Sequence, residues 1–488
     1  MTVRYTPVIG LEVHAELLTR TKMFCACAVV DTTRAEANSS VCPVCTGMPG
    51  SLPVINHEAV QHALRVALAL NCTIAPFSLF ARKNYFYPDL PKGYQISQYE
   101  YPLATGGCLP INTGNGEEII HLQRIHLEED TGKLTHIIDK KERYSLVDLN
   151  RAGVSLLEIV TKPELFSLES VKAYSVGLRA ILKCLKACSG DMEKGAIRFE
   201  ANISIRGSDS PQLGTRVEIK NLNSFRAMER AIKYEIERQT ATLSNGGVVE
   251  QETVGWDETV GQTVSQRSKE EAHDYRYFPE PDLPPLTIDA AWVDKIRAGL
   301  PELPNAKKDR FMRNYKVGEY HANLLSDDPD VSDYFEKTIY HNPSIAPQQI
   351  ANWITGDIFA YFNQTGSSIS DIQITPIGLG TIIEQVESGA LSRANGKQVL
   401  HEALVNGQSP DQIIKDRGFV MIEDENELQT LVAELISLSP REVEGYRAGK
   451  SSLLEWFVGQ AMKKSHGKAD PNQLRTFIRS VLENQPDK

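Results

Sequence analysis

The sequence lacks long hydrophobic runs. No stretch of about 18 consecutive apolar residues occurs among its 488 residues, which argues against a transmembrane helix. The first residues, Met-Thr-Val-Arg-Tyr-Thr-Pro, carry no apolar signal core, so we expect a cytoplasmic protein that does not associate with membranes. Tandem repeats and low-complexity tracts are also absent. With 41% hydrophobic and 24% charged residues, the composition is typical of a folded protein.

Familiar phosphate-binding fingerprints are missing as well. No Gly-x-Gly-x-x-Gly motif occurs. The segment Gly445–Ser451 resembles a phosphate loop, but it is one residue short of the required spacing and follows helical sequence instead of a strand. The net charge of −11 argues against non-specific nucleic-acid binding over the whole surface, although it permits a local basic patch.

The length exceeds what one hydrophobic core usually organises, so several domains are expected. Strand patterns dominate the first half, prolines crowd residues 279–285, and helical patterns follow. We expect an α+β protein with a mostly antiparallel, helix-backed sheet in the N-terminal part. The predicted domains are residues 1–292, a helical domain over 293–407, and a small helical tail over 408–488.

Four of the eight cysteines fall in one N-terminal window, as Cys25-x-Cys27 and Cys42-Pro-x-Cys45. Close pairs separated by a loop, in a reducing compartment, favour a structural zinc site. A redox pair and unligated thiols remain the alternatives at this stage. The other four cysteines are expected to be packing residues.

Several predicted strands have one apolar face and one face rich in charged and polar groups. In residues 8–17, Glu12 and His14 alternate with apolar residues, and residues 197–205 and 215–221 repeat the design, joined by a turn that predicts a hairpin. A solvated face explains one such strand. Its repetition favours a catalytic face of the sheet on which carboxylates hold Mg²⁺ and basic groups hold phosphate. We call this polar face of the sheet the floor.

An acidic stretch adds to this floor. Glu128, Glu129 and Asp130 follow an apolar segment, and Glu158 lies among apolar neighbours on its own strand face. A carboxylate in such surroundings is costly unless it is paired, protonated or bound to a metal. The alternative is a surface turn followed by an edge strand.

Two other regions have donors that suit anions. Residues 81–99 are rich in tyrosine and basic residues with little periodicity, which predicts a loop that contacts phosphate or nucleotide, or else a surface loop held by aromatic packing. Residues 441–479 carry eight basic and four acidic side chains, which fits an RNA-backbone contact and, nearly as well, a solvated helical face.

Several segments are long and distinctive: Val8-Ile-Gly-Leu-Glu-Val-His-Ala-Glu-Leu, Cys-Pro-Val-Cys-Thr-Gly-Met-Pro-Gly, Arg-Lys-Asn-Tyr-Phe-Tyr-Pro-Asp-Leu-Pro-Lys-Gly-Tyr-Gln-Ile-Ser-Gln, His-Leu-Glu-Glu-Asp-Thr-Gly-Lys, Asp-Leu-Asn-Arg-Ala-Gly-Val, Val-Glu-Ile-Lys-Asn-Leu-Asn-Ser-Phe and Glu-Ala-His-Asp-Tyr-Arg-Tyr-Phe-Pro-Glu-Pro-Asp-Leu. Together they closely resemble the B-subunit family of the aspartyl/glutamyl-tRNA amidotransferases. The resemblance covers essentially the whole chain, in order.

The resemblance implies an ATP-dependent carbon–nitrogen ligase with a cradle-like catalytic domain. It would phosphorylate the side-chain carboxylate of Glu on tRNA(Gln), or of Asp on tRNA(Asn), and transamidate it with ammonia that an amidase (A) subunit releases from glutamine. A small C subunit would complete a heterotrimer. The implied cofactors are ATP, Mg²⁺ and structural Zn²⁺.

The resemblance also implies roles for particular residues. The catalytic face would consist of Glu12, His14, Glu128, Glu129 and Glu158, with His14, Glu129 and Glu158 as the Mg²⁺ ligands. The ATP and aminoacyl pocket would be lined by Lys83, Tyr85, Asn150, Arg151, Glu200, Asn202, Glu218 and Lys220. Zinc would bind Cys25, Cys27, Cys42 and Cys45, and tRNA would contact Lys450, Lys463, Lys464 and Lys468. The competing hypothesis is a non-catalytic, zinc-containing RNA-binding scaffold.

Overall fold

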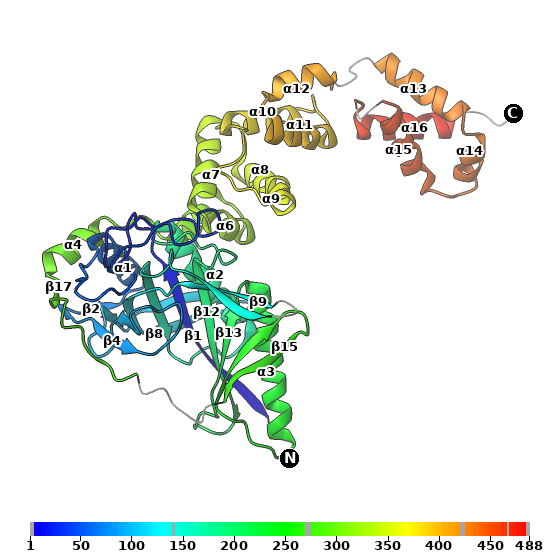
Figure 1. The fold of residues 1–488 in the computed structure, drawn as a ribbon. Helices are drawn as coiled ribbons and strands as arrows, with labels where there is room; N and C mark the ends of the chain where they lie inside the picture. Colours follow the sequence, from blue (N-terminus) through cyan, green and yellow to red (C-terminus); the bar gives the residue numbers. More distant parts are fainter. Residues whose placement is uncertain (1–3, 139–141, 269–274, 420–424, 466–467, 485–488) are drawn as a thin grey trace. The chain divides into compact units, whose positions relative to one another are not determined.

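A computed structural model describes residues 4–138, 142–268, 275–419, 425–465 and 468–484 (Figure 1). Residues 271–274, the Glu-Ala-His-Asp that opens the last motif quoted above, lie outside this part. The chain divides into two compact units, Met1–Pro304 and Asn305–Lys488. Within the described residues, none of the helices is both long and apolar enough to cross a membrane.

Unit 1 is built around a ten-stranded mixed sheet with the order β15-β14-β13-β12-β1-β11-β8-β6-β2, and β7 pairs with β8 off this path. The pair β13–β14 is parallel, whereas the other neighbours along this path are antiparallel. The strands are β1 (Tyr5–Glu16), β2 (Thr73–Ile74), β6 (Ala104–Thr105), β7 (Cys108–Thr113), β8 (Gly116–Glu129), β11 (Ser155–Thr161), β12 (Ile197–Gly207), β13 (Val217–Leu222), β14 (Glu252–Asp257) and β15 (Gln262–Ser268).

Strand alternation decides which side of the sheet each residue takes. On β1, Ile9, Leu11 and Val13 are fully buried in the main core, while Glu12 and His14 point to the other face. Helices α1 (His57–Ala69), α2 (Leu168–Cys184) and α3 (Phe225–Ser244) contribute to the same core (Figure 1). The hairpin expected between residues 205 and 215 is confirmed by the β12–β13 pairing.

The starts of the three helices follow from their sequence. Asn56, Ser167 and Ser224 each accept hydrogen bonds from backbone N–H groups of the first turn, as N-cap residues do. Helix α2 ends at Cys184 because Lys186, just beyond it, adopts a positive φ of 51°.

The prediction of a loop over residues 81–99 was wrong in part. Strands β4 (Ala81–Asn84) and β5 (Tyr94–Ser97) pair, and β16 (Phe278–Pro279) adds to β4, so that the order is β16-β4-β5. The third strand comes from a segment about 200 residues later, and no local pattern reveals such a pairing. Two further pairs are β9 (Lys133–Ile138) with β10 (Arg143–Asp148), and β3 (Phe77–Ser78) with β17 (Leu286–Thr287). Helix α4 (Ala290–Ala298) follows.

The described part of unit 2 is helical and has two hydrophobic cores, one within residues 311–419 and one within residues 428–482. Its elements are α5 (Pro304–Tyr315), α6 (Glu319–Ser326), α7 (Pro329–His341), α8 (Pro347–Asn352), the π-helix η1 (Trp353–Ile358), α9 (Phe359–Thr365), α10 (Pro376–Glu387), α11 (Arg393–Asn406), α12 (Pro410–Arg417), α13 (Glu425–Ser437), α14 (Pro440–Arg447), α15 (Leu453–Lys464) and α16 (Pro471–Asn484). The α+β class is confirmed, whereas the two boundaries between the three predicted domains stay predictions.

Candidate active site and metal centres

The polar face of the sheet carries a row of ionisable groups on adjacent strands. His14 on β1 lies opposite Glu158 on β11, and Glu158 lies opposite His126 on β8. The Nε2 atom of His14 is 3.4 Å from Glu158 and 3.7 Å from Glu128 Oε1, while that of His126 is 3.2 Å from Glu158. We call His14, His126, Glu128 and Glu158 the floor cluster.

His126, which is buried, is the one member of the floor cluster that was not predicted from the sequence. Strand alternation could have found it, because residues 126 and 128 lie on the same face of one strand. Its Nδ1 atom has no hydrogen-bond partner among the described residues, and its Nε2 atom faces both carboxylates of the cluster.

Electrostatics couples the members of the floor cluster. Burial lowers the pKa of His14, but the hydrogen bond and charge of Glu158 outweigh it and raise the pKa to about 9. Burial likewise opposes the charged form of His126, and Glu158 and Glu128 raise its pKa to about 9. Burial raises and the two imidazoles lower the pKa of Glu158, with a net value well below the usual range. The negative charges of Glu128 and Glu158 are therefore balanced either by protonated imidazoles or by a bound cation.

The geometry suits one divalent cation. One ligand atom from each of His14, Glu128 and Glu158 lies within 4.8 Å of the others, close to the about 4.2 Å that separates opposite ligands of an octahedral Mg²⁺. Glu128 also accepts a hydrogen bond from the Ser97 hydroxyl (3.2 Å), which fixes its orientation. These residues fit a metal.

The predicted ligand Glu129 does not lie in this cluster. Alternation places it on the opposite face of β8 from Glu128. There it forms an ion pair with Lys92 and accepts a hydrogen bond from the Ile96 backbone N–H (2.8 Å). The structure thus groups His14 and Glu158 with Glu128 instead.

A second carboxylate cluster, Glu12, Glu200 and Glu218, lies on the neighbouring strands β1, β12 and β13. Its ligand atoms also lie within 4.8 Å of one another. Lys220 donates to Glu200 (2.8 Å) and lies 3.3 Å from Glu218, and Asn202 donates to Glu12 (2.9 Å). Burial and the charges of the other acids raise the pKa of Glu12, so this site also favours a cation. All these predicted residues are brought together.

Arg151 stabilises the turn that follows the acidic run. Its guanidinium donates to the carbonyl oxygens of Thr131 (3.0 Å) and Gly132 (2.7 Å). Arg198, across from His14 on β12, forms an ion pair with Asp130 at 2.9 Å. Burial opposes the charged form of Asp130, but the two arginines lower its pKa.

The side-chain amide of Asn150, a residue predicted to line the nucleotide pocket, makes its hydrogen bonds within the protein. It is fully buried, its Oδ1 accepts from the Ser40 backbone N–H (2.8 Å), and its Nδ2 donates to the Glu36 carbonyl (2.7 Å). Both ends of the amide are therefore bound to the loop that contains the cysteines. Asn38 fastens the same loop by donating to Val147 and accepting from Leu149.

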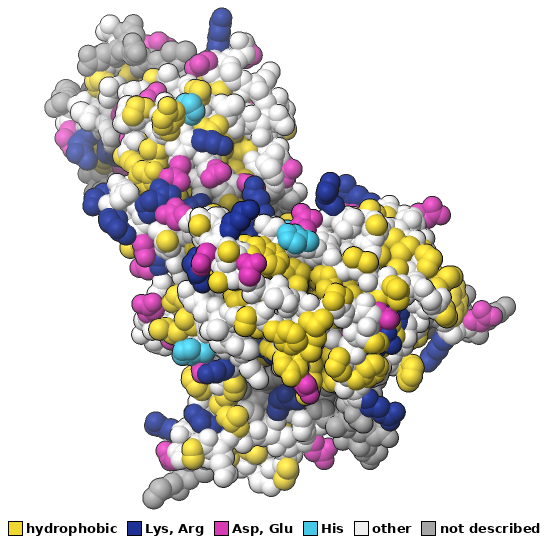
Figure 2. All heavy atoms as spheres, turned by 90° about the vertical axis from the view of Figure 1, so that its left-hand side faces the viewer, with side chains coloured by type: hydrophobic (Ala, Val, Ile, Leu, Met, Phe, Trp, Pro, Cys, Tyr) yellow, Lys and Arg dark blue, Asp and Glu magenta, His cyan; other side chains and the backbone are white. Residues whose placement is uncertain are grey.

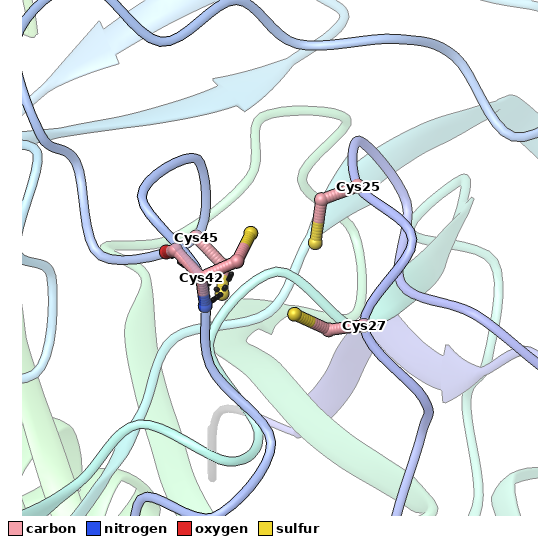
Figure 3. Close-up of side chains that lie close together, drawn as sticks. All are labelled: Cys25, Cys27, Cys42 and Cys45. Atoms are coloured by element: carbon pink, nitrogen blue, oxygen red, sulfur yellow. Dashed lines mark hydrogen bonds between the residues drawn. The ribbon is translucent and has the colours of Figure 1, made fainter.

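The four clustered cysteines converge on one point (Figure 3). Their sulfur atoms lie within 4.8 Å of one another, and the Sγ atoms of Cys42 and Cys45 are 3.9 Å apart. Two thiolates on a tetrahedral zinc ion are about 3.8 Å apart, given Zn–S bonds of about 2.3 Å. The Cys42 backbone N–H donates to Cys45 Sγ (3.2 Å), and the buried Lys22 ammonium lies 3.6 Å from the same sulfur. The residues fit zinc.

Lys83 and Tyr85 lie at the edge of the floor, on β4 and just after it. Burial alone lowers the pKa of Lys83, but the charges of Glu128, Tyr277 and Glu158 outweigh it. The ammonium therefore stays charged within the field of the floor cluster. Tyr85 donates a hydrogen bond to the side chain of Gln95 (3.2 Å).

The four predicted tRNA-contacting lysines lie on α15 or within a few residues of its ends. Lys450, Lys463 and Lys464 are exposed, and Lys468 is partly buried. Lys464 forms an ion pair with Glu434. Their contact with tRNA stays a prediction.

Comparison with known proteins agrees with this architecture. Residues 7–294 match the family described as GatB/GatE catalytic domain, and residues 333–482 match the family described as GatB domain. The chain is 48% identical over 478 residues to the B subunit of the aspartyl/glutamyl-tRNA(Asn/Gln) amidotransferase of Moorella thermoacetica, covering 98% of this chain and all of that protein. The corresponding B subunits of Persephonella marina (45%, covering 98% and 99%) and Thermotoga neapolitana (44%, covering 99% and 100%) are similar.

The family match over residues 7–294, which contain the sheet and its acidic face, places the chain among proteins with a GatB/GatE catalytic domain. More narrowly, the chain belongs to the family of aspartyl/glutamyl-tRNA(Asn/Gln) amidotransferase B subunits.

Proposed function

We propose that this chain activates the side-chain carboxylate of a misacylated tRNA with ATP and converts it to the amide. A carboxylate oxygen of Glu on tRNA(Gln), or of Asp on tRNA(Asn), attacks the γ-phosphorus of ATP, and ADP leaves. Ammonia then attacks the carbonyl carbon of the acyl phosphate, and phosphate leaves with the former carboxylate oxygen. The observation that carries the proposal is the row of carboxylates and imidazoles on one sheet face.

The residues of the floor have different proposed roles, which follow from their positions. His14, Glu128 and Glu158 would hold one Mg²⁺, and Glu12, Glu200 and Glu218 a second, with Glu128 in the place first assigned to Glu129. Bound Mg²⁺ neutralises charge on the phosphate oxygens. Lys83 and Lys220 supply further positive charge beside the floor, and Asn202 orients Glu12.

Parts of the chain away from the floor support the same proposal. A zinc ion on the four cysteines would hold the loop to which Asn150 is bound, and thereby the segment that leads to Arg151. The exposed lysines near the C-terminus would contact the tRNA backbone, whose phosphates bind cations without base specificity.

We further propose that an amidase subunit delivers the ammonia and that a small C subunit completes a heterotrimer in the cytoplasm. Exposed apolar surface supports assembly, because large exposed patches mark interaction sites. Hydrophobic side chains gather on the face seen in Figure 2. In the first hundred residues, large exposed side chains include Met48, Leu52, Val54 and Phe86.

A comparison of aminoacyl-tRNAs tests the function. With the assembled complex, ATP and glutamine, we expect phosphate release with Glu-tRNA(Gln) or Asp-tRNA(Asn) and only background release with Gln-tRNA(Gln) and Asn-tRNA(Asn), because the amide has no carboxylate oxygen to phosphorylate. Mass spectrometry of the released amino acid should show the amide. Phosphate release that is no higher with either misacylated tRNA than with its amide product would refute the proposal. The same comparison establishes which tRNA is the substrate.

A further inference from the structure

Lys83 lies in an aromatic cage at the edge of the floor. Its Nζ atom is 4.9 Å from the ring centroid of Tyr275 and 5.7 Å from that of Tyr85. In the described part of the chain, no hydrogen bond or ion pair joins this ammonium to another side chain. Aromatic faces attract a cation without neutralising it, so the charge remains available to an anion.

Two tyrosines of the cage extend into a longer aromatic row. The Tyr275 ring lies 6.0 Å from both Tyr85 and Tyr277 at interplanar angles of 71°, and Tyr277 stacks on Tyr99 at 4.1 Å and 3°. The Tyr275 ring is thus supported on two sides. Such support limits the movement of the ring that lies nearest the Lys83 ammonium.

The backbone beside Tyr275 is held in a sparsely populated conformation. Arg276 has a positive φ of 44°, which a side chain other than glycine rarely adopts. Asn84, next to Lys83, donates from its backbone N–H to the Tyr275 carbonyl (2.9 Å) and from Nδ2 to the carbonyls of Tyr275 (3.1 Å) and Arg276 (2.8 Å). Strain that the surroundings maintain in this way is typical of functional positions.

We propose that Tyr275 is a positioning residue for Lys83. The segment from Tyr275, fastened to β4 by Asn84 and by the β4–β16 pairing, places an aromatic face against the lysine and holds its ammonium within the electrostatic reach of Glu128 and Glu158. There the ammonium pairs with the phosphoryl group in transfer. The inference rests on the proposed function and extends it to a residue that acts through Lys83.

A double-mutant cycle tests the inference. In the assembled complex, Tyr275→Leu, which keeps apolar volume but removes the aromatic face, is expected to slow tRNA-dependent phosphate release by about tenfold. Tyr275→Phe keeps the face and is expected to stay within about twofold of the wild type. Lys83→Met is expected to be slower still, and Tyr275→Leu should add nothing to it, because the tyrosine acts through the lysine. Tyr144→Leu, at an exposed tyrosine of β10, is the control and should leave the rate unchanged.

A second readout does not need activity. Labelling of Lys83 by an amine-specific reagent, measured by mass spectrometry, should speed up in Tyr275→Leu and stay unchanged in Tyr275→Phe. Unchanged labelling, additive losses in the double variant, or a Tyr275→Leu rate equal to the wild type would each overturn the inference. So would wild-type activity in Lys83→Met. In that last case, phosphate release that still requires a misacylated tRNA leaves the proposed function standing, whereas equal release from the misacylated tRNA and its amide product refutes both.

Discussion

Replacing Glu158 by glutamine is expected to lower tRNA-dependent phosphate release by about a hundredfold or more. The carboxylate lies within 3.4 Å of both His14 and His126, and it is the group that links the imidazoles to the proposed cation site. Glutamine keeps the shape but removes the charge that a cation needs. The half-saturating Mg²⁺ concentration should rise by about tenfold or more.

Two matched variants make this result interpretable. Glu117→Gln changes an exposed residue of β8 and should leave the rate unchanged. Glu129→Gln removes the partner of Lys92 on the opposite face, so it should lower stability but leave the Mg²⁺ dependence as in the wild type. A Glu158→Gln enzyme with wild-type rate and Mg²⁺ dependence would contradict the proposed cation site. A Mg²⁺ defect in Glu129→Gln would restore the ligand set first predicted from the sequence.

Replacing Cys42 by serine is expected to reduce bound zinc from about one ion per chain to a small fraction of that, and to lower the melting temperature by about 5 °C or more. Thiolate ligands hold zinc far more tightly than a hydroxyl does. Loss of the ion frees the loop whose backbone binds both ends of the Asn150 amide. Elemental analysis and thermal unfolding measure the two effects.

The zinc experiment has its own control. Cys108→Ser changes a cysteine outside the cluster and should retain the zinc. The chelated wild type should melt like Cys42→Ser. Absence of zinc from purified wild type, or equal zinc content in Cys42→Ser, would refute a structural zinc site.

Much of the floor could be predicted because strand alternation is a local property. On β1 it separated Leu11 and Val13 from Glu12 and His14, and the same rule assigned Glu200 and Glu218 to the polar face. Applied to β8, the rule would also have included His126 and excluded Glu129. Those two discrepancies arose because the ligand set was taken from the family resemblance and not from the alternation of β8.

The remaining features depend on contacts between distant segments. Nothing near Asn150 in the sequence indicates that its amide binds residues 36–40, more than a hundred positions earlier. The pairing of β4 with β16, and with it the aromatic cage of Lys83, joins segments about 200 residues apart. The register of such segments and the hydrogen-bond partners of their buried side chains are set by tertiary packing, which local sequence patterns do not encode.

The fate of the carboxylate oxygen tests the central claim most directly. Glu-tRNA(Gln), or Asp-tRNA(Asn), labelled with ¹⁸O in the side-chain carboxylate is supplied to the complex with ATP and glutamine, and the phosphate is analysed by mass spectrometry. Formation of an acyl phosphate predicts that one ¹⁸O atom appears in each phosphate released per amide formed. Amide formation with no ¹⁸O in the phosphate would contradict the account.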